Sequence, residues 1–270
     1  MIMWKWEAEG TPKAVVAIIH SAYEYHYWYM WLIDELRAHG YHIVMGDLPG
    51  HGDSRRRERI HNESFTEYET FVQQTLQVAM RQDLPVFVIG QGLGATLVMQ
   101  ALRKKHGEVA GAVLLSPWLQ LQNTPSKLSG ALASMSKIAG NMKLTHHISL
   151  AGVTPNPEMF EDFDSPSVYS TKITVSWYRD LQLLMKDTQQ TTANKLPNKP
   201  LLVMTGTRDT ITQIDVTRQW LLQQTLTEFH YKEWVNSSHN LHMSQEREEV
   251  LHYIIDFFAN VLRSIGYIVE

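Results

Sequence analysis

Short runs of consecutive apolar residues recur along the chain, and each is closed by glycine, proline or a polar turn. Runs of this kind, without polar alternation, are typical of parallel strands that are buried on both faces of a sheet. We predict strands at Ala14–Ile19, Tyr41–Met45, Val86–Ile89, Val109–Leu115, Leu201–Met204 and, with a weaker pattern, Glu228–Trp234.

Stretches with helical periodicity fill most of the intervals between these runs. The last stretch has a broad apolar face, which is suited to covering a sheet. We predict helices at Trp28–Ala38, Ser64–Arg81, Gly94–Lys105, Asp215–Gln224 and Glu246–Leu262. Strands that alternate with helices indicate an α/β fold with a doubly wound, mostly parallel sheet.

The alternation stops between about residues 118 and 198, where the pattern is helical and carries scattered methionines and prolines. We predict a helical cap at residues 118–198, inserted into a core formed by residues 1–117 and 199–270. Open α/β sheets bind ligands at the carboxyl ends of their strands, where such insertions lie. Methionine fills irregular apolar space, which suits a greasy ligand, but ordinary helix packing accounts for the methionines equally well.

Composition narrows the class of protein. The 270-residue chain has no cysteine and a net charge of -4. It therefore has no thiolate nucleophile, cysteine metal site or disulfide, and no basic balance of the kind that nucleic acid requires. Lys5 and Glu7 interrupt the apolar start of the chain, and no run of about 18 apolar residues follows. We expect a cytoplasmic protein without a membrane span.

The most informative segment is a glycine-rich turn between a predicted strand and a predicted helix, Gly90-Gln91-Gly92-Leu93-Gly94. A strand that reverses directly into a helix needs small flanking residues, and the central residue is held in a strained conformation. In α/β hydrolases that residue is the serine of G-x-S-x-G. A phosphate-binding loop is the alternative, but the Lys-Ser/Thr pair of a P-loop is missing and the glycine spacing does not fit a dinucleotide site.

Two further polar residues follow predicted strands. Asp209 lies just beyond a strand that ends in a glycine turn, and His239 lies in a loop before the final helix. A nucleophile position, then an acid, then a histidine is the chain order of the α/β-hydrolase triad. Each residue alone is a weak signal, whereas the ordered set at Gly92, Asp209 and His239 is a strong one.

Several motifs resemble one branch of the α/β hydrolases, the monoacylglycerol lipase and lysophospholipase-like family. His20 to His26 is similar to its H-G-x-x-E-H segment, and Gly46 to Ser54 to its D-x-x-G-H-G-x-S loop. The opening of the helix at Ser64 also matches, and His239 to Val250 is similar to the family's H-E-x-x-x-E-x-x-R-x-x-V tail. The resemblance covers nearly the whole chain.

The resemblance implies an α/β-hydrolase fold with a cap and a carboxylic ester of a lipid as the ligand. It implies Asp209 as the catalytic acid and His239 as the base. The backbone N–H groups of Ala22 and Leu93 would form the oxyanion hole. We also expect Tyr23 and Glu24, in the oxyanion segment, to contact substrate. No cofactor is expected, and the resemblance explains His20, Glu24 and His26 without a metal ion.

The chain departs from the family's pattern at its centre. Gly92 stands where the nucleophilic serine is expected, Ser21 replaces a glycine, Gln91 a histidine and Ala95 a glycine. Glycine offers no oxygen to the histidine, so covalent acyl-enzyme chemistry is excluded. A site that lacks triad members still accelerates the reaction only about 10³- to 10⁴-fold over the rate in water. The clustered changes favour a natural origin of Gly92 over an introduced substitution, although the intact acid and histidine point the other way.

Three functions stay open at this point. The first is an ester hydrolase of this family that is inactive or severely impaired, and the second is a non-enzymatic acyl-lipid-binding or regulatory protein. The third is an enzyme in which His239 activates water. The basic run Arg55–Arg59 fits a solvated loop better than a contact with anionic lipid head groups. The aromatic residues from Tyr23 to Trp31 fit a pocket mouth or a packing face equally well.

Overall fold

The computed structural model describes residues 2–52, 60–105, 108–123, 140–146, 148–154, 172–190 and 195–267. Its centre is a seven-stranded sheet with the order β1-β3-β2-β5-β6-β9-β10. In chain order these strands are β1 Met3–Trp6, β2 Ala14–Ile19, β3 Tyr41–Gly46, β5 Val86–Gln91, β6 Gly111–Leu115, β9 Leu201–Gly206 and β10 Phe229–Trp234. β1 pairs antiparallel with β3, and the other pairs are parallel. This sheet confirms the predicted α/β class.

The apolar runs form strands because both faces of the sheet are covered. Every residue of β2, β5, β6 and β9 is buried. All six predicted strands are present, with small shifts at their ends. β1 was missed because its sequence, Met-Trp-Lys-Trp, places a lysine in a half-exposed edge strand and shows no continuous apolar run.

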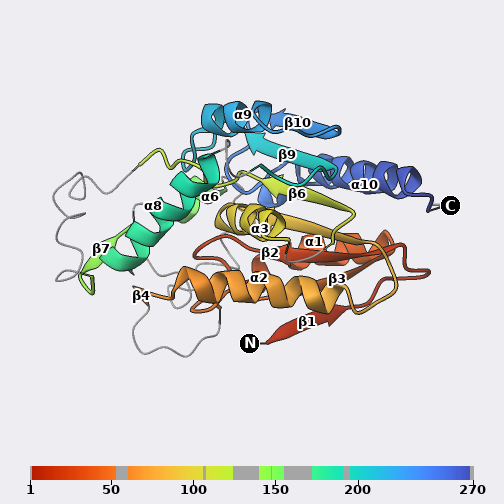
Figure 1. The fold of residues 1–270 in the computed structure, drawn as a ribbon, viewed down its shortest axis with the longest axis horizontal. Coiled ribbons are helices and arrows are strands. Elements are labelled where there is room, and N and C mark those ends of the chain that lie inside the picture. Colours follow the sequence, from red (N-terminus) through yellow and green to blue (C-terminus); the bar gives the residue numbers. More distant parts are fainter. Residues whose placement is uncertain are drawn as a thin grey trace.

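Helices pack on both faces of the sheet (Figure 1). They are α1 Met30–Ala38, α2 Phe65–Ala79, α3 Leu93–Arg103, α9 Ile214–Leu222 and α10 Arg247–Ser264. α2 and α3 cover one face, and α1 and α10 cover the other. α2 begins at a capping box in which the Ser64 hydroxyl accepts from the Glu67 N–H and the Glu67 carboxylate accepts from the Ser64 N–H. The five helices match the five predicted ones.

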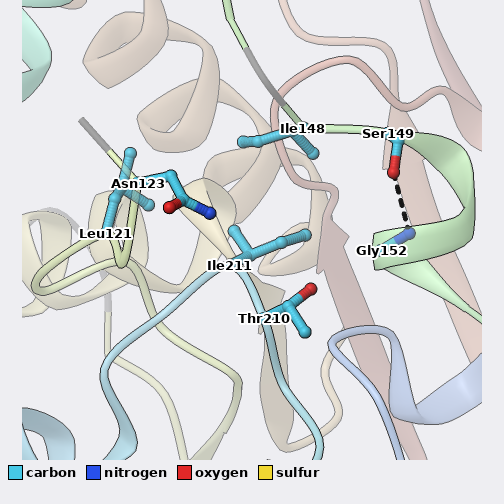
Figure 2. Close-up of a pocket in the computed structure, with 7 residues that line it drawn as sticks. All are labelled: Leu121, Asn123, Ile148, Ser149, Gly152, Thr210 and Ile211. Atoms are coloured by element: carbon cyan, nitrogen blue, oxygen red, sulfur yellow. Dashed lines mark hydrogen bonds between the residues drawn. The ribbon is translucent and has the colours of Figure 1, made fainter. Parts of the chain in front are cut away.

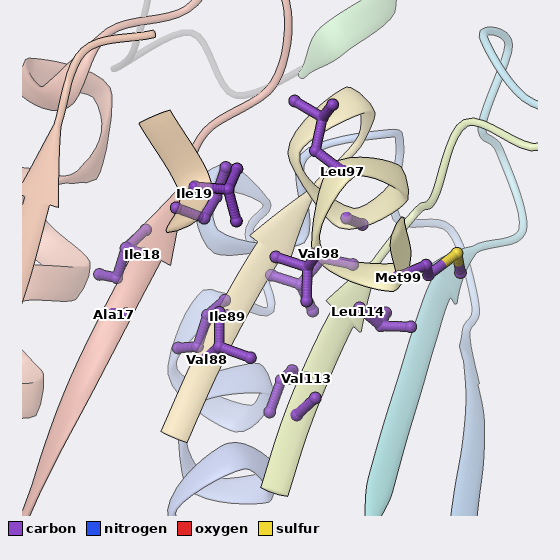
Figure 3. Packing of buried hydrophobic residues seen from close by; sticks show 14 of the residues in the cluster. Ala17, Ile18, Ile19, Val88, Ile89, Leu97, Val98, Met99, Val113 and Leu114 are labelled. Carbon is purple, nitrogen blue, oxygen red and sulfur yellow. The ribbon is translucent and has the colours of Figure 1, made fainter. Parts of the chain in front are cut away.

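The hydrophobic core fixes α3 against the middle of the sheet. Val98 of α3 belongs to one buried cluster with Val88 of β5 and Leu114 of β6, which point to the face of the sheet that α3 covers (Figure 3). On the other face, Phe87 stacks on Phe258 of α10 with ring centroids 4.2 Å apart. α3 is therefore held rigidly at its N-terminus, where the glycine-rich turn lies.

The segment predicted as a cap contains more than helices. Its described elements are β7 Lys143–Thr145, α6 Leu150–Val153, β8 Lys172–Thr174 and α8 Val175–Gln189. β7 and β8 form a small sheet with β4, Ile60–His61, in the order β4-β8-β7. These strands were not predicted because two or three residues are too few to show a period of two. α8 is docked on α3 through a 2.7 Å ion pair between Arg103 and Asp187.

Several sequence-based expectations lie outside the described residues. The basic run Arg55–Arg59 and, within the predicted cap, residues 124–139 and 155–171 are among them. The division into a core of residues 1–117 and 199–270 and a cap of residues 118–198 stays a prediction, as does the cytoplasmic location. Among the described ranges, no helix is long and apolar enough to cross a membrane.

Candidate active site

The glycine-rich turn joins the end of β5 to the start of α3, as its sequence predicts. Gly92 has φ +53° and ψ −116°, a conformation that L-residues with a side chain rarely adopt. A Cβ on Gly94 would lie 2.2 Å from the Ile19 carbonyl oxygen, so that flanking position admits only glycine. The Gly92 N–H donates to Leu115, and its carbonyl accepts from the Trp118 N–H. The turn is thereby tied to the segment that follows β6.

Asp209 and His239 meet at the carboxyl ends of β9 and β10. Nδ1 of His239 lies 2.8 Å from Oδ2 of Asp209, and both side chains are buried. The Asp209 carboxylate also accepts from the Ile211 N–H, the Thr212 N–H and the Thr212 hydroxyl. Burial opposes ionisation most strongly, but His239 and the hydrogen bonds from His239 and Thr212 hold the pKa of Asp209 below its usual value. The acid is therefore an ionised group that orients the ring.

The other ring nitrogen of His239 is also occupied. The indole Nε1 of Trp118 donates to Nε2 of His239 at 3.1 Å. An indole N–H is a donor only, so Nε2 carries no proton and Nδ1 carries the one shared with Asp209. The same Nε1 lies 3.0 Å from the place of a Cβ on Gly92. Trp118 thus contacts the histidine from the region where a nucleophile would stand.

Ser21 lies directly in front of Gly92. Its Oγ accepts from the Leu93 N–H at 3.1 Å, and it would lie 2.1 Å from a Cβ on Gly92. The Ser21 N–H donates to Glu24 Oε2 at 3.1 Å, and the Ser21 carbonyl lies 2.7 Å from Nδ1 of His20. Because Nε2 of His20 accepts from the Leu48 N–H, Nδ1 of His20 carries the proton and donates to Ser21.

A buried network joins the Ser21 loop to the histidine loop. Glu24 accepts from the Tyr29 hydroxyl at 2.5 Å and from Nδ2 of Asn240 at 2.7 Å. Nε2 of Gln91 donates to Oδ1 of Asn240 and to the His239 carbonyl. The carboxylate of Glu24 thus accepts its hydrogen bonds from other residues of the chain. Its contact with substrate stays a prediction.

Tyr23 contacts residues of the site as well as residues in or next to the small sheet. It has a positive φ of 70° and stacks on His146, with ring centroids 3.7 Å apart and planes 9° from parallel. Its ring also lies 6.1 Å from that of Trp118 and 6.0 Å from that of Trp177 on α8. Tyr23 and Ala22 are buried beside Ser21, so both sequence-predicted neighbours of the oxyanion segment lie at the site.

A pocket opens beside the acid loop (Figure 2). Thr210 and Ile211, which follow Asp209, form one side of it, and the start of α6 with its preceding residues forms another. Its described lining includes apolar Leu121, Ile148 and Ile211 and neutral polar Asn123, Ser149 and Thr210. None of the described lining residues carries a charge.

The structure therefore brings Gly92, Leu93, Asp209 and His239 together, with Ala22, Tyr23 and Glu24 on the adjoining loop. Sequence reasoning missed Trp118, which follows β6, and the contact between Gln91 and Asn240. The position of Trp118 just beyond a predicted strand was the available signal, because the carboxyl ends of parallel strands share one edge of the sheet. A tryptophan carries no recognised catalytic pattern, so its role was not predicted.

The fold and the ordered site define the class of α/β hydrolases. The chain belongs to the family described as serine aminopeptidase, S33, whose family model matches residues 10–246.

Relatives and solved structures agree with this assignment. Phospholipase YtpA of Bacillus subtilis is 35% identical over 250 residues, which cover 92% of this chain and 95% of that protein. Human monoglyceride lipase is 32% identical over 126 residues, which cover 45% of this chain and 40% of that protein. The crystal structure of Paleococcus ferrophilus monoacylglycerol lipase superimposes with a TM-score of 0.78 at 21% identity, covering 97% of this chain and all of that one. The chain is therefore a lipid- or carboxylic-ester-hydrolase-like α/β hydrolase.

Proposed function

We propose that this chain binds an acyl ester or acyl lipid at the site around Gly92 and does not cleave it through a covalent intermediate. One observation carries the proposal: the ordered Asp209–His239 pair faces a position without a side chain. The serine mechanism needs an oxygen whose proton passes to the histidine, and Gly92 has none. This favours the binding reading over the impaired-hydrolase reading.

A reaction through water is also disfavoured. A water molecule that attacks an ester must give its proton to the free lone pair of the base. On His239 that lone pair accepts from the Trp118 indole instead. Water activation would therefore require the indole to leave first, with the loss of a buried hydrogen bond.

The family relatives support an acyl ligand, since those named above are lipases and a phospholipase. The residues that line the pocket beside Asp209 indicate which kind of head group the ligand carries. Phosphate groups are bound by arginine, lysine or backbone N–H clusters, whereas the described lining offers hydroxyl and amide groups next to aliphatic side chains. We therefore favour an acyl lipid with an uncharged, hydroxylated head group, such as a monoacylglycerol, over a lysophospholipid.

Two measurements on the purified chain test this function. A fluorophosphonate probe should leave the protein unlabelled while it labels an active serine hydrolase in the same tube, because such probes need an activated nucleophile. Medium-chain monoacylglycerols should raise the melting temperature, since a ligand that binds only the folded state stabilises it. The proposal fails if the probe labels a site residue stoichiometrically, or if no lipid in the panel shifts the melting temperature.

A further inference from the structure

The side chain of Ser21 fills the space that a residue-92 side chain would occupy. A Cβ on Gly92 would lie 2.1 Å from Oγ and 2.8 Å from Cβ of Ser21, both too close for real atoms. Ser21 and a side chain at position 92 therefore exclude one another. Ser21 is the residue that replaces a glycine of the family pattern, and Gly92 the residue that replaces its serine, so the two departures are in contact and complementary.

Ser21 also takes the hydrogen bond that the reacting carbonyl would need. The Leu93 N–H, at the start of α3, is the backbone donor that the family pattern assigns to the oxyanion hole. Here it donates to Oγ of Ser21 at 3.1 Å. An N–H carries one hydrogen, so a ligand carbonyl can bind there only by displacing the Ser21 hydroxyl.

Hydrogen bonds to the backbone of Ser21 fix the position of its hydroxyl. The Ser21 N–H is fixed by Glu24, and the Ser21 carbonyl is fixed by His20. Ser21 is buried, with 1% of its surface exposed, and Glu24 is in turn anchored by Asn240 and Tyr29. Rotation of Oγ away from Leu93 would leave a buried N–H unpaired, which costs a desolvation penalty. The loop therefore holds the Ser21 hydroxyl firmly in its hydrogen bond with the Leu93 N–H.

We propose that Ser21 stands in for the carbonyl oxygen of an ester, so that the site selects an acyl lipid by its chain and head group and does not read the ester bond. This inference rests on the proposed function and specifies its ligand. An ester and an ether with the same chain and head group then bind equally well. Ser21 is the specificity-determining residue, since its removal releases the Leu93 N–H for a ligand carbonyl.

The experiment compares 1-decanoylglycerol with 1-O-decylglycerol, below their micelle concentrations, by calorimetric titration. In the wild-type chain we expect the two dissociation constants to agree within about twofold. In Ser21→Gly, the ester should gain about 3- to 10-fold over the ether, the usual net value of one recovered hydrogen bond. Ser264→Gly is the matched control, because this serine lies at the far end of α10 and its hydroxyl donates to Val261. It should keep the wild-type ratio.

The outcomes of this experiment distinguish a failure of the role of Ser21 from a failure of the proposed acyl-lipid binding. A wild-type chain that prefers the ester by about tenfold or more overturns the role of Ser21 and leaves acyl-lipid binding in place. Binding of neither compound removes the proposed function and this inference together. Acylation of Ser21 by the ester, found by mass spectrometry, would show that Ser21 is a nucleophile and would contradict both. The wild-type comparison decides the matter even if Ser21→Gly does not fold.

Discussion

The indole N–H of Trp118 donates to Nε2 of His239 across 3.1 Å, while Nδ1 of the same ring faces Oδ2 of Asp209 at 2.8 Å. Both nitrogens of the histidine are therefore satisfied by the chain itself. Because the indole cannot accept and the carboxylate is ionised, the ring is a neutral Nδ1–H tautomer. The acid and the histidine keep their usual relation, but the base has a tryptophan as its partner.

Trp118→Phe should break this bond while keeping an aromatic ring in place. We expect the nitrogen-15 shift of His239 Nε2 to change and the free energy of unfolding to fall by about 1–3 kcal/mol, because a buried acceptor is left unpaired. Trp220→Phe is the control, since the Trp220 indole donates to the Thr188 carbonyl, a different acceptor. It should lose comparable stability and leave the His239 signal unchanged. A His239 Nε2 signal that already carries a proton in the wild-type chain would contradict the assignment.

Gly92→Ala should be far more costly alone than together with Ser21→Gly. Alanine at φ +53° adds backbone strain of about 1–3 kcal/mol, and its Cβ meets Ser21. Overpacking adds about 1–3 kcal/mol, and this part disappears when residue 21 is glycine. A urea-unfolding cycle of the two single variants and the double variant should give a coupling energy of about 1–3 kcal/mol. Additive effects within about 0.5 kcal/mol would mean that the two positions are independent.

His242 should make the fold sensitive to acid. It is buried beside the site and stacks on Tyr29 at 4.3 Å. Burial lowers the pKa of His242 to about 3, the nearby His239 lowers it further by a smaller amount, and the backbone of Trp28 opposes the shift. Below about pH 6.5 the unfolded chain takes up a proton that the folded chain refuses. Neutral His242 therefore contributes fully to the free energy of unfolding above about pH 6.5. That contribution is lost progressively as the pH falls from 6.5 toward 3.

His242→Phe tests this directly, because phenylalanine keeps a ring for Tyr29 and cannot titrate. At pH 7.5 we expect a small change in stability. At pH 4.5 the variant should exceed the wild-type chain by about 2–3 kcal/mol, after subtraction of the difference at pH 7.5. His252→Phe, at a histidine on the exposed side of α10, should show no such gain. Parallel stability curves for wild type and His242→Phe between pH 4 and 8 would rule out the assignment.

The apolar runs and helical periods predicted the central sheet because burial on both faces leaves a strong pattern in each strand. Gly92, Asp209 and His239 could be predicted as a set because each follows a strand and the three come in the family's order, and the structure places Asp209 and His239 in contact. Trp118 and Asn240 were not found, because their roles depend on contacts between loops that are far apart in the chain. The strands β7 and β8 were missed because they are too short for their pattern to be read.

The exclusion between Ser21 and Gly92 was beyond sequence reasoning for a different physical reason. Two departures from a family pattern are visible in the sequence, but the distance between them is not. The notable pairing is geometric: the Ser21 hydroxyl occupies a volume that only a residue without Cβ leaves open. This complementarity favours a natural origin of Gly92 over an introduced substitution.

The carboxylate of Glu24 receives hydrogens from three separate segments, through the Ser21 N–H, the Tyr29 hydroxyl and Nδ2 of Asn240. A displacement of the Ser21 loop must therefore break or drag a bond to the segment that carries His239. The Ser21 loop and the segment that carries His239 are therefore coupled through Glu24. A substitution that moves the Ser21 loop is expected to disturb the position of His239 as well.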